Sequence, residues 1–405
     1  MNTIAPEEVG VSSTRMNRIS KTMQSYVDEG KLAGLITMIA RRGQVFNYEC
    51  FGMMDIQANK PMQPDTIFRI YSMTKPITSV AIMMLYEGGD FQLKDPASRF
   101  IPGFKDVRVF VNTTESGLEL AELEREVTIR DLLTHTSGLV YGDSEGSPVE
   151  AAVWQADREA EKVTSDETLE EWIRRLVRLP LAHQPGAKWH YGLSTDVLGY
   201  VVEVISGLAF DAFLEQRIFA PLGMVDTGFY VPQEKIGRLA VLYGPAEDGG
   251  LQVIDAPETS KYSEPKRFLS GGGGLVSTAS DYMRFSQMLL NGGELNGVRL
   301  LSRETVELMK TNHLSDELIP IDLDPLTPYL RGHGFGFGFA VITDVAQSGM
   351  LGSEGTFWWG GFANTFFWID PREELVGLIM PQLTPAGDKT IQREFQELCY
   401  QAIVD

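Results

Sequence analysis

Ser72 and Lys75 are the two residues whose types and spacing most directly suggest chemistry. In the first turn of a helix, side chains three positions apart lie on the same face and can touch. A serine hydroxyl becomes a good nucleophile when a neighbouring base takes its proton, and a buried lysine amine can serve as that base. Because Ser-x-x-Lys also occurs by chance in long chains, the pair needs support from its surroundings.

The surrounding residues predict a buried helix that starts at this pair. Ser72 is suited to cap a helix, Pro76 is tolerated in a first turn, and Gly88-Gly89 supplies a stop. The residues between these signals are apolar nearly all round the helix, which predicts a path through the protein interior. They are Ile77, Val80, Ala81, Ile82, Met83, Met84 and Leu85.

Strands are predicted at both ends of the chain, and helices fill its middle. Ser12 or Ser13 can cap a first helix, which a hairpin follows. The predicted strands are Leu35–Ala40, Gln44–Phe51, Phe335–Thr343, Thr356–Ile369 and Leu375–Met380. Further helices are predicted at Thr128–Leu133, Asp166–Leu179, Leu193–Ile205, Phe210–Phe219, Ala279–Leu290, Ser302–Lys310 and Thr390–Val404.

This order of elements predicts an α+β fold, in which an antiparallel sheet is flanked by the N- and C-terminal helices. We expect residues 1–92 and 268–405 to form the sheet domain and residues 93–267 to form an inserted, mostly helical domain. The active site is expected at the interface of the two. Two polar stretches, Gly142–Ser165 and His313–Arg331, are predicted to be long loops of the kind that often wall functional sites.

The composition and charge of the chain argue against several classes of partner. The formal net charge of -20 argues against nucleic acid or an anionic membrane as a partner. No apolar run is long enough to span a membrane, and Met1–Gly10 lacks a signal-peptide pattern, so we expect a cytoplasmic protein that acts on a small molecule. The five histidines are scattered and form no His-Glu-x-x-His pattern, so no metal and no cofactor is expected. The oligomeric state is left open.

Two further stretches could contribute to a site. Tyr191 stands just before a predicted helix and could deliver its hydroxyl into a cleft. Trp359-Gly360-Gly361 places two glycines within a predicted strand, which indicates either a close approach to the backbone or a β-bulge. Each stretch, taken alone, also has an ordinary structural interpretation.

The ordered set of these motifs resembles the serine β-lactamase and penicillin-binding protein superfamily, and most of all its family VIII carboxylesterases. The set comprises Ser72-x-x-Lys75, Leu133-Thr134-His135-Thr136-Ser137-Gly138-Leu139, Tyr191, Gly272-Gly273-Gly274-Leu275-Val276-Ser277-Thr278 and Trp359-Gly360-Gly361. The resemblance covers nearly the whole chain.

The resemblance implies a role for each matching residue. Ser72 would be the nucleophile, with Lys75 and Tyr191 sharing the proton transfers; which of these two acts as the base in each step is left open. The backbone amides of Ser72 and Phe362 would form the oxyanion hole. Trp359, Gly360 and Gly361 would contribute to substrate binding.

Two departures from the β-lactamase pattern indicate the substrate class. Tyr191-Gly192-Leu193 replaces Tyr-x-Asn, and Trp359 replaces the lysine of Lys-Thr-Gly, so recognition of an anionic β-lactam is weakened. We therefore expect a carboxylesterase for small neutral esters with short acyl chains, with β-lactams as side substrates. The alternatives are a β-lactamase or D-amino-acid peptidase, an acyltransferase, and a non-catalytic penicillin-binding-like protein.

Gly142-Asp143-Ser144-Glu145-Gly146 matches the Gly-x-Ser-x-Gly motif of α/β-hydrolases. That motif needs a strand before it and a helix after it, whereas here a polar loop precedes it and Pro148 follows. Ser144 is therefore not expected to be the nucleophile.

Overall fold

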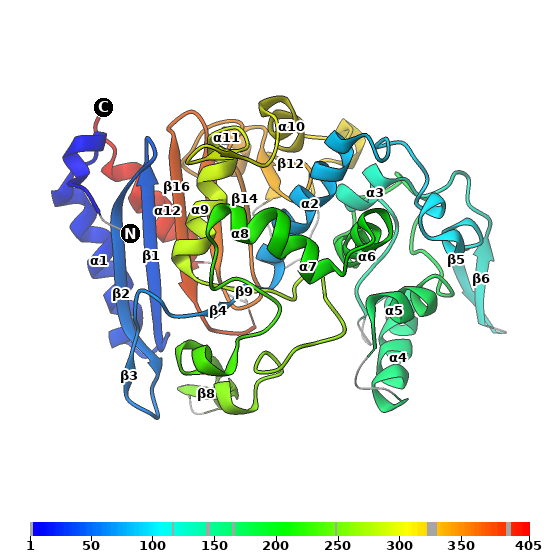
Figure 1. Ribbon diagram of the computed structural model, residues 1–405, viewed down its shortest axis with the longest axis horizontal. Coiled ribbons are helices and arrows are strands. Elements are labelled where there is room, and N and C mark those ends of the chain that lie inside the picture. Colours follow the sequence, from blue (N-terminus) through cyan, green and yellow to red (C-terminus); the bar gives the residue numbers. More distant parts are fainter. Residues whose placement is uncertain are drawn as a thin grey trace.

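The chain forms an eight-stranded antiparallel sheet with helices on both faces, in the order β12-β13-β14-β15-β16-β1-β2-β3 (Figure 1). This computed structural model describes residues 3–115, 117–142, 146–163, 167–247, 249–321, 330–385 and 390–405. The α+β prediction is confirmed. The strands are β1 (Gly34–Arg41), β2 (Gln44–Asp55), β3 (Lys60–Pro61), β12 (His333–Phe335), β13 (Ala340–Ile342), β14 (Phe357–Gly360), β15 (Phe366–Asp370) and β16 (Leu375–Pro381).

The N-terminal and C-terminal parts of the chain meet in the centre of this sheet. Strand β1 pairs with β16 from Leu35 opposite Pro381 to Arg41 opposite Leu375. Both strands are buried along their whole length, so each face of the sheet must be covered. The strongly apolar sequence of β1 and β16 is what a sheet covered on both faces requires.

Neighbouring side chains on β15 show which helices cover which face. Phe367 packs on Tyr282 of α9 (Ala279–Leu290), with ring centroids 5.0 Å apart. Trp368 packs on Phe395 of α12 (Thr390–Ala402), at 5.4 Å. Because consecutive strand residues point to opposite faces, α9 and α12 lie on opposite sides of the sheet. Helix α1 (Ser13–Asp28), capped by Ser12, packs beside α12.

Helix α2 (Thr74–Gly88) is buried as predicted and ends at Gly89, which has a positive φ of 81°. Its start differs from the prediction. Ser72 does not cap α2, because it lies in a short 3₁₀ turn, η2 (Tyr71–Met73), that precedes the helix. The N-cap of α2 is Met73, which has no side chain able to cap, so the hydroxyl of Ser72 is not used to cap the helix.

Residues 93–267 contain hairpins as well as the predicted helices. The hairpins are β5 (Val109–Thr114) with β6 (Gly117–Ala121) and β7 (Leu242–Pro245) with β8 (Leu251–Asp255). The first lies at the end of the molecule farthest from α1 (Figure 1). The division into two domains stays a prediction. The helices here are α3 (Ile129–Leu133), α4 (Pro148–Val163), α5 (Leu169–Leu176), α6 (Ser194–Ser206), α7 (Phe210–Leu214), the π-helical turn η5 (Glu215–Phe219) and α8 (Ala220–Leu222).

The remaining elements are short. They are the strand pairs β4 (Phe68–Arg69) with β9 (Val276–Ser277) and β10 (Glu294–Leu295) with β11 (Val298–Arg299), the helices α10 (Arg303–Met309) and α11 (Val345–Ser348), and the 3₁₀ turns η1 (Pro6–Val9), η3 (Ala97–Arg99), η4 (Pro102–Lys105), η6 (Gln233–Arg238), η7 (Pro257–Thr259) and η8 (Asp316–Leu318). Within the described ranges, no single helix is long and apolar enough to cross a membrane; α6 and Phe210–Leu222 reach that threshold only together, with a bend of 79° between them.

The prediction of a long loop over Gly142–Ser165 is wrong, because α4 occupies most of it. Pro148 begins this helix, a place where its missing N–H does no harm, and Val149 and Val153 are its buried residues one turn apart. In the second predicted loop, His313–Arg331, η8 forms a short turn. Ser144 and residues 322–329 lie outside the described residues, so the structure does not place them.

Two of the predicted long strands are instead hairpins. The stretch Phe335–Thr343 reverses between β12 and β13, where Gly338 has a φ of 91°. The stretch Thr356–Ile369 reverses between β14 and β15, directly after Gly360. Such a reversal is hard to recognise in the sequence, because both strands of a buried hairpin are apolar and read as one long strand.

Candidate active site

Lys75 stands beside Ser72, as the spacing of the two residues predicts. Its ammonium nitrogen Nζ lies 3.2 Å from Ser72 Oγ, and the side chain is fully buried. Nζ also lies 2.7 Å from the carbonyl oxygen of Gly272 and 2.9 Å from the hydroxyl of Tyr141. A neutral amine has two N–H donors and one lone pair. As an ammonium, Nζ can donate to all three oxygens; as a neutral amine whose two N–H donors go to Gly272 and Tyr141, it turns its lone pair to the Ser72 hydroxyl and can accept that proton.

Two tyrosines surround this amine in different ways. Tyr141 offers its hydroxyl to Lys75, whereas Tyr191 places the face of its ring under it, with Nζ 4.5 Å from the ring centroid. The rings of the two tyrosines also pack edge to face, with centroids 5.4 Å apart. Burial, and then the neighbouring Tyr191 and Asp196, raise the pKa of Tyr141 well above its usual value. Tyr141 therefore keeps its proton and acts as a hydroxyl.

Trp359 lies behind Tyr191. Its indole Nε1 donates a hydrogen bond to the Tyr191 hydroxyl over 3.3 Å, and its side chain is only 4 % exposed. The ring also packs against Tyr191, with centroids 5.2 Å apart. A direct contact between Trp359 and substrate stays a prediction; in the structure this residue orients the hydroxyl of Tyr191.

The glycines after Trp359 let the β14–β15 turn approach the segment that carries Ser72. A Cβ atom on Gly361 would lie 2.4 Å from the carbonyl oxygen of Ile70, so only glycine fits there. The close approach expected from the glycine pair is thus made by the chain just before Ser72. On Gly360 a Cβ atom would have its closest contact at 3.2 Å, so this position is less constrained.

Ser72 and Phe362 line the same cavity. In the described part of the chain neither of their backbone amides has a hydrogen-bond acceptor. Tyr71, just before Ser72, has a φ of 43°, which is uncommon for a residue other than glycine and is found at constrained functional turns. Two unpaired amides beside a nucleophile are what an oxyanion hole needs.

Asp196 anchors the glycine stretch that receives Lys75. Its carboxylate accepts hydrogen bonds from the amide of Gly272, at 3.0 Å, and from the hydroxyl of Ser270, at 2.5 Å. A Cβ atom on Gly272 would lie 2.4 Å from this carboxylate. Burial raises the pKa of Asp196, and the nearby charge of Lys75 partly offsets that rise.

His135 supports the segment that carries Tyr191. It is buried, and its Nδ1 lies 3.4 Å from the amide nitrogen of Gly192. Its ring centroid lies 5.0 Å from that of Tyr191. Burial, with the charge of Lys75 nearby, keeps the pKa of His135 well below its usual range, so the ring stays neutral.

The cavity at Ser72 has a volume of about 690 Å³. Helices α4 and α5 contribute Asp157 and Trp172 to its wall. None of the described residues that line it is a lysine, arginine or histidine. The full lining is Tyr71, Ser72, Tyr141, Gly142, Asp157, Trp172, Tyr191, Leu193, Asp196, Phe268, Ser270, Gly272, Gly273 and Phe362.

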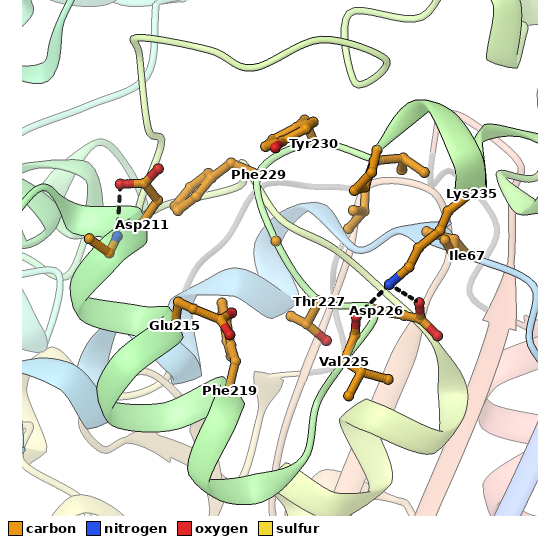
Figure 2. Close-up of a pocket in the computed structure, with 15 residues that line it drawn as sticks. Ile67, Asp211, Glu215, Phe219, Val225, Asp226, Thr227, Phe229, Tyr230 and Lys235 are labelled. Atoms are coloured by element: carbon orange, nitrogen blue, oxygen red, sulfur yellow. Dashed lines mark hydrogen bonds and ion pairs between the residues drawn. The ribbon is translucent and has the colours of Figure 1, made fainter.

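A second cavity, of about 370 Å³, lies between α7 and the segment 225–235 (Figure 2). Lys235 at its edge is held by the carbonyl oxygen of Val225 and by Asp226, each at 2.8 Å. None of the predicted site residues lines this cavity. Across the described ranges, no group of three or more His, Cys, Asp or Glu side chains is arranged to hold a metal ion.

The sequence did not point to Tyr141 or Asp196. Tyr141 follows Leu133–Leu139 by two positions, and a hydroxyl-bearing aromatic at the end of that motif is a signal that could have been used. Asp196 is a carboxylate in the first turn of an otherwise apolar helix, which usually indicates a buried polar role.

The chain is similar to known proteins along nearly its whole length. Residues 19–398 match the family described as Beta-lactamase. The chain is 38 % identical over 369 residues to Protein Rv1367c of Mycobacterium tuberculosis, covering 90 % of this chain and 89 % of that protein. It is 30 % identical over 388 residues to Esterase EstB of Burkholderia gladioli, covering 91 % of each. The solved structure of EstCE1, described as a hydrolase with promiscuous acyltransferase activity, superposes with a TM-score of 0.78 at 26 % identity, covering 95 % of this chain and 98 % of that one.

Proposed function

Because this chain belongs to the β-lactamase family of serine β-lactamases and penicillin-binding proteins, we propose that it is a serine carboxylesterase acting through an acyl-enzyme on Ser72. Its substrates are small neutral esters with short acyl chains. The observation that carries the proposal is the buried Lys75 amine, held by Gly272 and Tyr141 so that its remaining position faces Ser72 Oγ.

The reaction has two halves. Ser72 Oγ attacks the ester carbonyl carbon while its proton passes to Lys75, and the amides of Ser72 and Phe362 stabilise the oxyanion. When the bond to the alcohol oxygen breaks, Lys75 returns the proton to that oxygen through the tyrosine hydroxyls. A water then attacks the acyl-enzyme in the same way, releasing the acid and restoring Ser72.

The cavity favours esters over β-lactams as main substrates. A β-lactam antibiotic carries a carboxylate, which is best bound by a cationic side chain. The described lining offers no basic residue. In the motif resemblance, Trp359 stands where β-lactamases have the lysine of Lys-Thr-Gly. β-Lactams are therefore expected only as side substrates.

Acyl transfer to an alcohol is the second candidate, because EstCE1 is described as a hydrolase with promiscuous acyltransferase activity. The same acyl-enzyme serves both reactions, and the outcome depends on whether water or an alcohol reaches it. Adding a short alcohol during ester hydrolysis and measuring the new ester against the free acid separates the two.

The test of the proposal is the initial rate of hydrolysis of p-nitrophenyl butyrate by the wild-type protein, Ser72→Ala and Ser144→Ala. We expect activity to be lost in Ser72→Ala and kept in Ser144→Ala. An active Ser72→Ala protein, or a wild type that turns over no short-chain ester, would overturn the proposal.

A further inference from the structure

The cavity wall carries carboxylates and aromatic rings but, among its described residues, no basic side chain. We propose that the preferred substrate is an ester bearing a cationic ammonium group, which binds between the aromatic rings and the carboxylate of Asp157. The inference rests on the proposed esterase function: small neutral esters remain substrates, and an ester that also carries a cationic group is hydrolysed with a higher kcat/KM.

The aromatic residues line the cavity from several separate segments. Trp172 of α5 packs on Phe268, with ring centroids 5.4 Å apart, and Tyr71 packs edge to face on Phe362 at 6.0 Å. Phe362 is 54 % exposed although it lines the cavity, so a ligand can reach its ring. The faces of aromatic rings attract cations, and aromatic cages are a common way to bind quaternary ammonium groups.

Asp157 adds a negative charge that is not fully neutralised. Its Oδ1 lies 2.5 Å from Arg175 Nη1, and the same guanidinium lies 2.8 Å from the carboxylate of Glu167. One cation thus serves two carboxylates, so the three side chains together carry one negative charge. The side chain of Asp157 is 39 % exposed and lines the cavity, whereas Glu167 does not line it.

Lys75 does not cancel this preference, whether its amine is charged or neutral. It is fully buried and is not among the residues that line the cavity, and Ser72 and Tyr141 stand between its amine and that space. The second carboxylate of the wall, Asp196, lies below the surface on Gly272. With a formal net charge of -20, the molecule as a whole also attracts cations.

The experiment compares esters that differ only in charge. One pair is butyrylcholine and its carbon isostere, in which carbon replaces the quaternary nitrogen; this pair places the charge in the alcohol. The other pair is the p-nitrophenyl esters of γ-butyrobetaine and of its carbon isostere, which place the charge in the acyl group. We expect kcat/KM for the cationic member of at least one pair to be about tenfold higher than for its isostere.

Asp157→Asn and Glu167→Gln are the matched variants, because each removes one carboxylate from Arg175 and only Asp157 lines the cavity. Asp157→Asn should lower the cation-to-isostere ratio by about threefold or more, and Glu167→Gln should change it much less. A substitution that lowers activity in general lowers kcat/KM for both esters of a pair, so its effect cancels in the cation-to-isostere ratio.

Ratios near one in both pairs, or a ratio unaffected by Asp157→Asn, would overturn the inference while leaving the esterase function standing. If the wild type hydrolyses none of these esters, cationic or neutral, the proposed function itself fails, and the inference fails with it.

Discussion

The hydroxyl of Tyr141 lies 2.9 Å from Lys75 Nζ, nearer than the hydroxyl of Ser72 at 3.2 Å. The family resemblance assigns a role in proton transfer to Tyr191. In the structure, however, Tyr191 presents the face of its ring to that amine. Lys75 thus contacts both tyrosines, Tyr141 through its hydroxyl and Tyr191 through its ring, so we expect Tyr141 to take part in the proton transfer from Ser72.

Tyr141→Phe should lower kcat/KM for a short p-nitrophenyl ester by about tenfold to a hundredfold, because it removes one of the groups that orient the amine towards Ser72. Steady-state kinetics measure the effect. Tyr200→Phe, a tyrosine outside this cavity, is the control and should stay near the wild-type rate. Equal rates for the two variants would show that Tyr141 does not contribute to catalysis.

Trp359→Phe should lower kcat several-fold and leave KM nearly unchanged. The variant keeps a buried aromatic ring but removes the N–H that donates to the Tyr191 hydroxyl. Saturation kinetics with a neutral ester give both constants. A raised KM with unchanged kcat would show instead that Trp359 contacts the substrate directly, since loss of uniform binding affects KM alone.

Gly361→Ala should reduce kcat by about a hundredfold, because its new methyl group collides with the carbonyl of Ile70 and displaces the amide of Phe362. Gly360→Ala, with more room, is the matched control and should lose much less. Activities are compared after thermal unfolding curves show that both variants fold. An active Gly361→Ala protein would rule out this turn as part of the oxyanion hole.

Stability should fall in mild acid because of His183. Burial lowers its pKa from 6.5 to about 4, helped by the charges of His190 and Lys188 and opposed by that of Glu150. The unfolded chain takes up a proton as pH falls below 6.5, whereas the folded chain does so only near 4, so acid favours unfolding across this interval. Since the ring is only partly buried, the effect should be about 1 kcal/mol.

Urea unfolding of the wild type and His183→Gln at neutral and mildly acidic pH tests this effect. The variant should lose less unfolding free energy on acidification than the wild type. An identical loss in both proteins would mean that His183 does not contribute to the acid sensitivity.

The sequence predicted the parts of the fold whose periodicity matches their burial. Helix α9 has the predicted bounds, and the β1–β2 hairpin forms from the predicted strands Leu35–Ala40 and Gln44–Phe51. Helix α4 was missed because, among its residues of described burial, only Val149 and Val153 are buried, and the stretch is rich in charged residues. The hairpin β14–β15 was missed because both of its arms are apolar.

The contacts of the candidate site that join residues close in sequence were predictable. Those that join distant segments of the chain were not. Ser72 and Lys75 are neighbours on one turn, so spacing alone brings them together. Tyr141 reaches Lys75 across 66 positions of the chain, and Asp196 reaches Gly272 across 76. Such contacts depend on how α6 packs against the segment Gly272-Gly273-Gly274. A local sequence pattern carries no information about this packing.

The most direct test of the central claim is the mass of the protein during turnover. Wild-type protein quenched in acid while hydrolysing p-nitrophenyl butyrate should carry one butyryl group, and peptide mapping should place it on Ser72. The same treatment of Ser72→Ala should give the unmodified mass. A butyryl group on another residue, or one retained in Ser72→Ala, would contradict the assignment of Ser72 as the nucleophile.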